Sequence, residues 1–181
     1  MRWLIFTSER TDSPQLFAEV RETGELLQLT DRPDLGDWSI HPSRDGRYVY
    51  FTAGSGGWRV NIETQEEEQL VDFAALAAAA GGVALREQGM VAAAMGTTAL
   101  SHNDRYWAVK FNAGADACLA IVDTTSGESE IILRRDTIAH LQFCPDDDNL
   151  LFYAGPLTDR VWVINRDGSH NRRLYQRTPD E

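Results

Sequence analysis

The sequence has little of what marks a membrane, secreted or disulfide-rich protein. It contains no run of about eighteen apolar residues, the length that a membrane-spanning helix needs. Its N-terminus, Met1-Arg-Trp-Leu-Ile-Phe-Thr7, reaches polar residues too soon for the apolar core of a signal peptide. Only two cysteines occur, Cys118 and Cys144, and their spacing fits neither a metal site nor a disulfide framework. We therefore expect a soluble protein of the reducing cytoplasm.

Basic residues are also scarce. The chain has 17 Lys and Arg against 28 Asp and Glu, which gives a net charge of −11 and argues against nucleic acid or a membrane as partner. The imbalance lies in the first 131 residues, since residues 132–181 hold 7 basic and 8 acidic side chains. A site for an anionic ligand is therefore expected in this C-terminal part, which includes Arg134, Arg135 and Arg160. The alternative is that these arginines lie on solvated strand faces.

What the sequence does contain is a repeat. Short apolar strands separated by polar turns recur four times, and one aromatic position recurs as Phe6, Phe51, Phe111 and Tyr153, with spacings of 45, 60 and 42 residues. A period in the low forties with four short strands per repeat is typical of propeller blades. We therefore predict an all-β fold, a β-propeller with about four blades of four antiparallel strands, in a single partial domain over residues 1–181.

The predicted repeats cover approximately residues 1–35, 36–73, 97–135 and 139–176. Three of them open with a short strand and a polar turn, as at Trp38–Arg47, where Pro, Asp and Gly favour chain reversal. An alanine-rich insertion at approximately residues 74–91 separates the second repeat from the third. Within it, residues 73–80 are a candidate short helix ended by a glycine pair, and residues 89–98 are expected to lead into the third repeat.

Four blades are at the low end of the range of about four to eight that propellers have. The chain is therefore expected to form a small or assembled ring, or to be part of a longer propeller. An open fragment would expose unpaired strand edges, which favour aggregation or self-association with another copy.

The last quarter of the chain resembles a known family. His140-Leu-Gln-Phe-Cys-Pro-Asp-Asp147, Gly155-Pro156, Arg160-Val-Trp-Val-Ile-Asn-Arg-Asp-Gly-Ser169 and Arg172-Arg-Leu174 are similar to the strand and turn motifs of the oligogalacturonate lyases. Phe6-Thr-Ser-Glu-Arg-Thr11 looks like an early blade of that family, a pattern that many TolB-like propellers share. The resemblance implies a seven-bladed ring that cleaves short oligogalacturonides by β-elimination, assisted by manganese or a similar divalent ion.

The same resemblance implies that His140 is the catalytic base. A neutral imidazole, with an unperturbed pKa near 6.5, suits removal of the C5 proton of a uronate. The charge that develops on the carboxylate needs a metal or an arginine, and Arg134, Arg135 and Arg160 are the candidates for substrate binding. The family's metal ligands lie in later blades, so the resemblance places none in this chain, which would be the N-terminal half of such an enzyme.

One departure concerns Cys118-Leu-Ala-Ile-Val122, because family members carry an arginine in that strand. Arg134 and Arg135, on the following strand, are the nearest replacements. The other histidines have weaker claims: His41 and His102 are expected in turns, and His170 in an exposed turn.

Two classes of function stay open. A lyase, or its base-bearing half, would act on an acidic oligosaccharide and would place His140 on the central channel near basic side chains. A non-catalytic TolB-like module would bind a protein or another ligand on its rim, and His140 would merely begin a strand.

Overall fold

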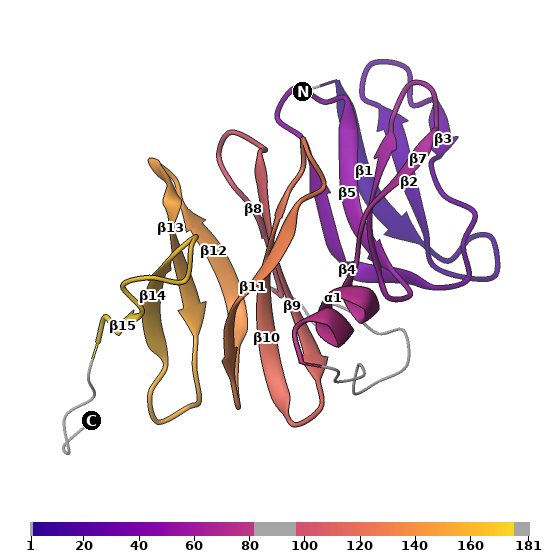
Figure 1. Ribbon diagram of the computed structural model, residues 1–181. Coiled ribbons are helices and arrows are strands. Elements are labelled where there is room, and N and C mark those ends of the chain that lie inside the picture. Colours follow the sequence, from indigo (N-terminus) through magenta and orange to yellow (C-terminus); the bar gives the residue numbers. More distant parts are fainter. Residues whose placement is uncertain (1, 82–96, 176–181) are drawn as a thin grey trace.

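The fold is that of a computed structural model, which describes residues 2–81 and 97–175. It contains four antiparallel sheets, formed one after another along the chain, and one short helix. Figure 1 shows the sheets side by side, with the N-terminal sheet at one end of the row and the C-terminal sheet at the other. The prediction of an all-β propeller with about four blades is confirmed. No helix within the described ranges is both long and apolar enough to cross a membrane.

The first blade has three strands, β1 (Trp3–Ser8), β2 (Gln15–Val20) and β3 (Leu26–Gln28), in the order β1-β2-β3. Gly24 turns the chain between β2 and β3 with a φ of +72°, a conformation that glycine adopts without steric cost.

The second blade has four strands, β4 (Leu35–Pro42), β5 (Tyr48–Ala53), β6 (Gly56–Asn61) and β7 (Glu67–Asp72). Each strand pairs with the next one along the chain. The polar turn that follows β4 was expected from its Pro, Asp and Gly residues, and Gly46 there has a φ of +70°.

A short helix, α1 (Phe73–Ala79), follows β7 directly. The Asp72 side chain caps it by accepting hydrogen bonds from the backbone N–H groups of Ala74 and Ala75. Its alanines favour the helix, and burial of Phe73 and Ala77 anchors a segment that is too short to be stable alone. This agrees with the helix predicted over residues 73–80. Residues 82–96, including most of the predicted return segment, lie outside the described residues.

The third blade consists of β8 (Thr98–Leu100), β9 (Tyr106–Ala113), β10 (Asp116–Asp123) and β11 (Ser129–Arg135). It repeats the strand order of the second blade, with every strand antiparallel to its neighbour.

The fourth blade consists of β12 (Ala139–Cys144), β13 (Asp147–Ala154), β14 (Val161–Asn165) and β15 (Arg172–Arg173). In the three complete blades the first strand lies on the inner side, since β8 packs beside both β4 and β12. We call β4, β8 and β12 the inner strands.

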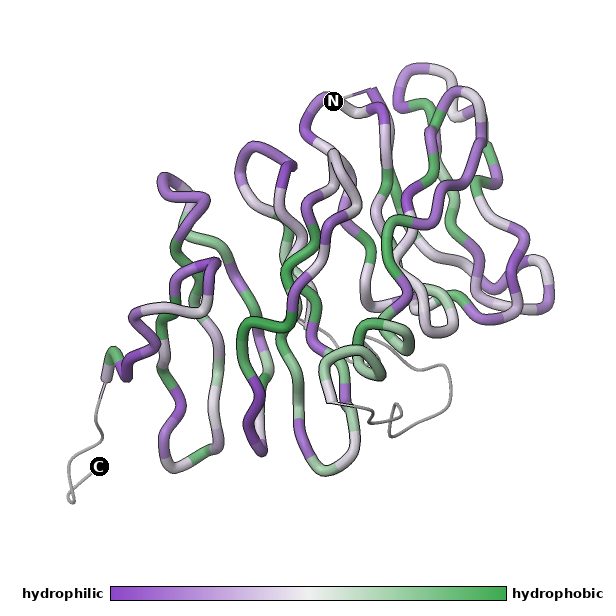
Figure 2. The backbone as a smooth tube through the Cα atoms, viewed as in Figure 1, coloured by the Kyte–Doolittle hydropathy of each residue, from purple (hydrophilic) through white to green (hydrophobic). Residues whose placement is uncertain are grey.

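The core is divided among the interfaces between neighbouring blades. One apolar cluster joins blades 1 and 2 around Phe51, a second joins blades 2 and 3 around Trp107, and a third joins blades 3 and 4 around Tyr153. Figure 2 shows the hydrophobic residues concentrated on the strands and on α1, whereas the turns are mostly hydrophilic. Burial of these faces, at about 25 cal/mol per Å² of apolar area, holds the blades together.

Candidate functional site

His140 lies on inner strand β12 with an exposed side chain. Its backbone has a φ of +47°, in the left-handed region that a non-glycine residue adopts at a cost of about 1–2 kcal/mol. This left-handed residue lies where the pairing of β12 with β13 is irregular, between Ala139 and Gln142. Within residues 2–81 and 97–175, no hydrogen bond or ion pair holds the His140 ring. A strained, exposed histidine on an inner strand is available to a ligand.

The three arginines proposed from the sequence each have a partner elsewhere. Arg134, at the end of β11, donates to the backbone carbonyl of Ala80 over 2.6 Å. Arg160, just before β14, donates to the carbonyl of Gly155 over 3.1 Å. In the part of the chain that the structure describes, neither forms a hydrogen bond or ion pair with His140.

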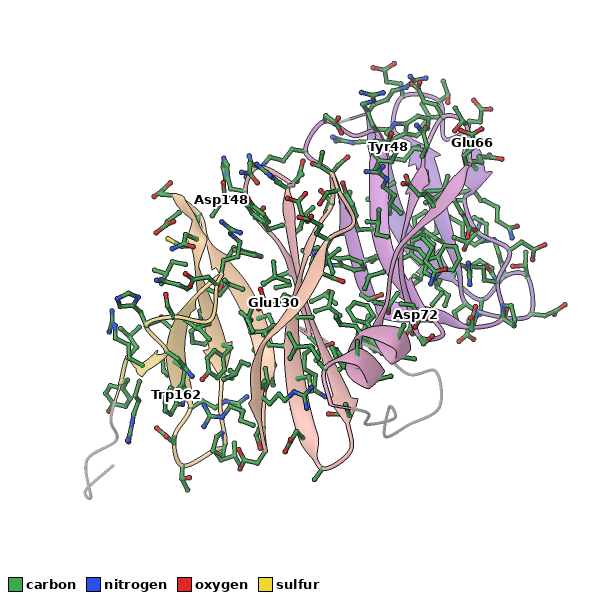
Figure 3. All side chains as sticks on the ribbon, viewed as in Figure 1. Tyr48, Glu66, Asp72, Glu130, Asp148 and Trp162 are labelled. Carbon is green, nitrogen blue, oxygen red and sulfur yellow. The ribbon has the colours of Figure 1, made fainter. Side chains whose placement is uncertain are left out.

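Arg135 belongs to an aromatic stack instead. Its guanidinium lies 4.4 Å from the ring centroid of Trp162 and donates to the Tyr153 hydroxyl over 2.7 Å. That hydroxyl donates in turn to the side chain of Asn171 over 2.9 Å. Burial raises the pKa of Tyr153, although the bond from Arg135 acts in the opposite direction. Figure 3 shows Trp162 among the side chains of the C-terminal blade. Arg135, at the end of β11 in blade 3, therefore connects its blade to blade 4 rather than offering a free cation.

Cys118 replaces the arginine that the family resemblance places on this strand. It is fully buried in β10, opposite Arg134 in the strand register, and burial raises the pKa of its thiol. The strand thus supplies an apolar side chain to the core and no charge to a site.

The turn prediction for His41 is wrong. His41 lies within β4 because that strand continues beyond an irregular pairing between Gly36 and His41. Its ring nitrogen Nε2 is 2.6 Å from the Thr98 hydroxyl, and burial lowers the pKa of the imidazole. His102 does occupy a turn, where its Nδ1 accepts from the Arg44 guanidinium at 2.6 Å. His170 is exposed, as predicted.

His41 and His102 border a hollow of about 330 Å³ between the inner strands. Its wall also includes Thr98, Arg44 and Gln142. It lies toward the Cys144 end of β12, so His140, at the other end, is not among the residues that line it.

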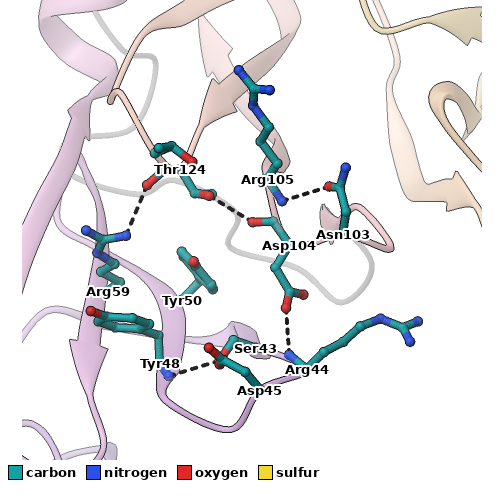
Figure 4. Close-up of a pocket in the computed structure, with 11 residues that line it drawn as sticks. Ser43, Arg44, Asp45, Tyr48, Tyr50, Arg59, Asn103, Asp104, Arg105 and Thr124 are labelled. Carbon is teal, nitrogen blue, oxygen red and sulfur yellow. Dashed lines mark hydrogen bonds between the residues drawn. The ribbon is translucent and has the colours of Figure 1, made fainter.

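A second hollow, of about 520 Å³, lies between blades 2 and 3 (Figure 4). The backbone N–H of Arg44 donates to the Asp104 carboxylate over 2.7 Å, and Arg59 donates to the carbonyl of Thr124 over 3.0 Å. Burial is the main cause that raises the pKa of Asp104, and the nearby Asp45 adds to it. The sequence analysis missed this group of residues. The sequence feature that could have revealed this group is a pair of similar turns, Ser43-Arg-Asp-Gly-Arg-Tyr48 and Ser101-His-Asn-Asp-Arg-Tyr106.

A manganese-type ion does not fit the residues at hand. Across residues 2–81 and 97–175, no group of three or more His, Cys, Asp or Glu side chains is arranged to hold a metal ion. We therefore derive no chemical step from a metal bound by this part of the chain.

Solved structures with the same fold include two oligogalacturonate lyases. A complex of oligogalacturonate lyase with manganese matches 98% of this chain with a TM-score of 0.78 and 18% sequence identity. The enzyme from Vibrio parahaemolyticus matches 98% with a TM-score of 0.76 and 20% identity. TolB from Acinetobacter baumannii matches 99% with a TM-score of 0.65 and 13% identity.

These similarities establish the β-propeller fold. The chain spans 50%, 50% and 42% of the three matched chains, respectively. The expected structural likeness to oligogalacturonate lyases and TolB-like propellers is confirmed. No protein-family model and no curated protein sequence matches the chain.

Proposed function

We propose that this chain is the base-bearing part of a propeller lyase that acts on short oligogalacturonides during pectin degradation. The observation that carries the proposal is the match of 98% of the chain to half of an oligogalacturonate lyase, at a TM-score of 0.78. The exposed His140 on inner strand β12 adds a base of suitable chemistry. Because Cys118 and Cys144 are both free thiols, we assign the reaction to the cytoplasm.

In this reaction His140 accepts the proton from C5 of the uronate. The electrons of the C5–H bond form a C4=C5 double bond, and the C4–O bond to the preceding sugar breaks. The imidazolium then returns the proton to the departing oxygen or to water. These transfers require that the imidazole be neutral when the substrate binds.

The developing charge on the uronate carboxylate must be stabilised by a cation. Arg134, Arg135 and Arg160 are each bound elsewhere, so none of these three arginines is a free cation for this role. We therefore propose that residues 1–181 alone have at most trace activity, and that further blades complete the site.

The test is to incubate the pure 181-residue chain with trigalacturonate and divalent manganese, and to follow the ultraviolet absorbance of the unsaturated product. We expect a trace rate that His140→Ala abolishes. His102→Ala is the matched control, since His102 is also exposed but lies at the other end of the inner strands, and it should keep the trace rate. Fast turnover by the pure chain would contradict the proposed trace activity, and a rate that His140→Ala leaves unchanged would contradict the role of His140 as base.

A second candidate is a non-catalytic binding module of the TolB-like type. The observation in its favour is that all three arginines are occupied while the hollows lie away from His140. This function predicts no product from trigalacturonate and no binding of it either. Equilibrium dialysis with trigalacturonate separates the two candidates, because a base-bearing half-site should bind the sugar in a manner that His140→Ala weakens.

A further inference from the structure

Two of the inner strands are irregular at the same place. In β4, the residues Asp37–Ile40 lie opposite the single residue Phe51 of β5. In β12, His140 and Leu141 lie opposite the single residue Tyr153 of β13. Phe51 and Tyr153 occupy the aromatic position that recurs in each repeat, so the two irregular stretches are equivalent. Extra residues of this kind form β-bulges, which often re-aim a side chain next to a functional site.

A buried side chain holds the bulge of β4 in place. The Ser39 hydroxyl is fully buried and donates to the backbone carbonyl of Gly36 over 2.6 Å. It also accepts a hydrogen bond from the backbone N–H of Thr52 over 2.8 Å. A Cβ atom at position 36 would collide with the Thr52 hydroxyl, so the close approach of the two strands requires glycine. The bulge therefore has a defined structure.

Trp38 lies in this bulge and is 51% exposed. Each of the other four tryptophans contacts an aromatic ring or an arginine side chain: Trp3, Trp58, Trp107 and Trp162. Over residues 2–81 and 97–175, the ring of Trp38 has no such contact, and its indole N–H has no hydrogen-bond acceptor. A braced bulge thus presents a large flat side chain, with one free donor, to the outside of the sheet.

The bulge of β12 presents His140 in the corresponding way, with an exposed side chain. β8 packs beside both β4 and β12, so these three strands follow one another around the inner side of the blades. The blades of a propeller surround a central channel. Equivalent places on β4 and β12 therefore lie at the same end of that channel, with Trp38 two blades away from His140.

We infer that Trp38 is a sugar-binding residue, which stacks on one galacturonosyl ring of an oligogalacturonide while His140 acts on a neighbouring unit. This inference rests on the proposed function. In the galacto configuration, the hydrogens on C3, C4 and C5 point to one face of the pyranose ring and make that face apolar. An indole ring offers a matching flat apolar surface, and its N–H can donate to a sugar oxygen.

The charges near the bulge agree with this mode of binding. Stacking on the apolar face of a sugar needs no cation, and the three candidate arginines are bound elsewhere. Asp37, which precedes Trp38 in the bulge, is exposed and can accept a hydrogen bond from a sugar hydroxyl. Its negative charge would turn the uronate carboxylate away from the bulge.

The test observes the indole N–H signals of the intact chain by two-dimensional NMR. The signal of Trp38 is the one that disappears in Trp38→Phe. On titration with trigalacturonate, we expect this signal to shift in a saturable manner. The signal of Trp107, which is fully buried, should stay in place.

Variants measure how much Trp38 contributes to affinity. In equilibrium dialysis, Trp38→Ala should weaken trigalacturonate binding about three- to tenfold, the range expected for loss of one aromatic stacking contact. Trp38→Phe keeps a flat ring and should weaken binding less. Leu157→Ala is the matched control, because Leu157 is 82% exposed but lies between β13 and β14, away from the inner strands. It should bind like the natural chain.

The sugar site and the proposed reaction fail in different ways. If trigalacturonate shifts the Trp38 signal and Trp38→Ala weakens binding, but no unsaturated product forms, the reaction is wrong and the sugar site stands. If product forms in a manner that depends on His140, while Trp38→Ala leaves both Kd and KM unchanged, the inference about Trp38 is overturned. The absence of a saturable shift of the Trp38 signal at millimolar trigalacturonate would overturn it as well.

Discussion

The backbone N–H of Arg44 donates to the carboxylate of Asp104 across 2.7 Å, from the turn after β4 to the turn after β8. This bond joins blades 2 and 3 near their inner strands. The start of β13 receives a longer contact of the same kind, in which the N–H of Asn103 in the turn after β8 donates to Asp148 over 3.4 Å. The turns that reverse the chain therefore also connect one blade to the next.

Replacing Asp104 should test this connection. Asp104 has a φ of +61°, so Asp104→Gly removes the hydrogen bond while relaxing the backbone, whereas Asp104→Ala removes the bond and keeps the unfavourable conformation. We expect Asp104→Ala to lower the free energy of unfolding by about 2 kcal/mol and Asp104→Gly by less than about 1 kcal/mol. Urea denaturation measures both values. Equal losses in the two variants would show that backbone strain at this position is not significant.

The blade pattern was predictable because it is local. Strand alternation and the Pro, Asp and Gly residues of the turns depend on neighbours in the sequence, and they led to an all-β propeller with four blades. The contacts that decide which side chains are free are not local. Arg135 donates a hydrogen bond to Tyr153, which lies 18 residues further along the sequence. The direction in which the Arg135 side chain points depends on which face of β11 packs against blade 4.

The candidate site was only partly predictable for the same reason. His140 was found through its motif, but its left-handed backbone arises from irregular strand pairing, which the sequence does not reveal. The three arginines were chosen by charge, and charge alone does not indicate whether a carbonyl or an aromatic ring already binds them. The prediction that His41 lies in a turn was wrong because β4 continues past an irregular pairing and includes residues that are typical of turns.

The half-buried ring of His41 should make stability depend on pH. Its pKa is lowered by burial, so the unfolded chain binds a proton at a higher pH than the folded chain does. Stability from this group is therefore complete above the ordinary value of 6.5 and declines as the pH falls below it. In His41→Gln this contribution is absent. The difference in unfolding free energy between the natural chain and His41→Gln should be larger at pH 8 than at pH 5.5, as measured by urea denaturation. A constant difference would contradict the assignment.

Arg135 should behave as a structural residue. Lysine at this position keeps the charge but loses the planar stacking on Trp162, so Arg135→Lys should lower the unfolding free energy by about 1 kcal/mol. Tyr153→Phe removes the hydroxyl that Arg135 and Asn171 share, at a cost of about 1–2 kcal/mol. A double-mutant cycle over these two substitutions should show coupling, because they disrupt the same interaction.

The control is Arg160→Lys, since the Arg160 guanidinium donates to the backbone carbonyl of Gly155 and, within residues 2–81 and 97–175, to no other group. We expect a smaller loss there, of less than about 0.5 kcal/mol. A larger loss of unfolding free energy in Arg160→Lys than in Arg135→Lys would contradict the structural role of Arg135.

Gly57 tests how closely blades 2 and 3 approach each other. A Cβ atom at this position would lie 2.7 Å from Cγ1 of Val71, 2.8 Å from Cζ3 of Trp107 and 3.2 Å from Cε2 of Phe73. All three side chains belong to the cluster between these blades, and Trp107 and Phe73 are fully buried, so none can move without disturbing its neighbours. We expect Gly57→Ala to lower the unfolding free energy by about 1–3 kcal/mol.

Gly24→Ala is the control, because a Cβ there meets no atom within 4 Å and only the φ of +72° opposes it. Urea denaturation should show the larger loss at Gly57. If Gly24→Ala lowered the unfolding free energy as much as Gly57→Ala does, backbone conformation would explain both losses. The tight contact between blades 2 and 3 would then not be the reason for a glycine at position 57.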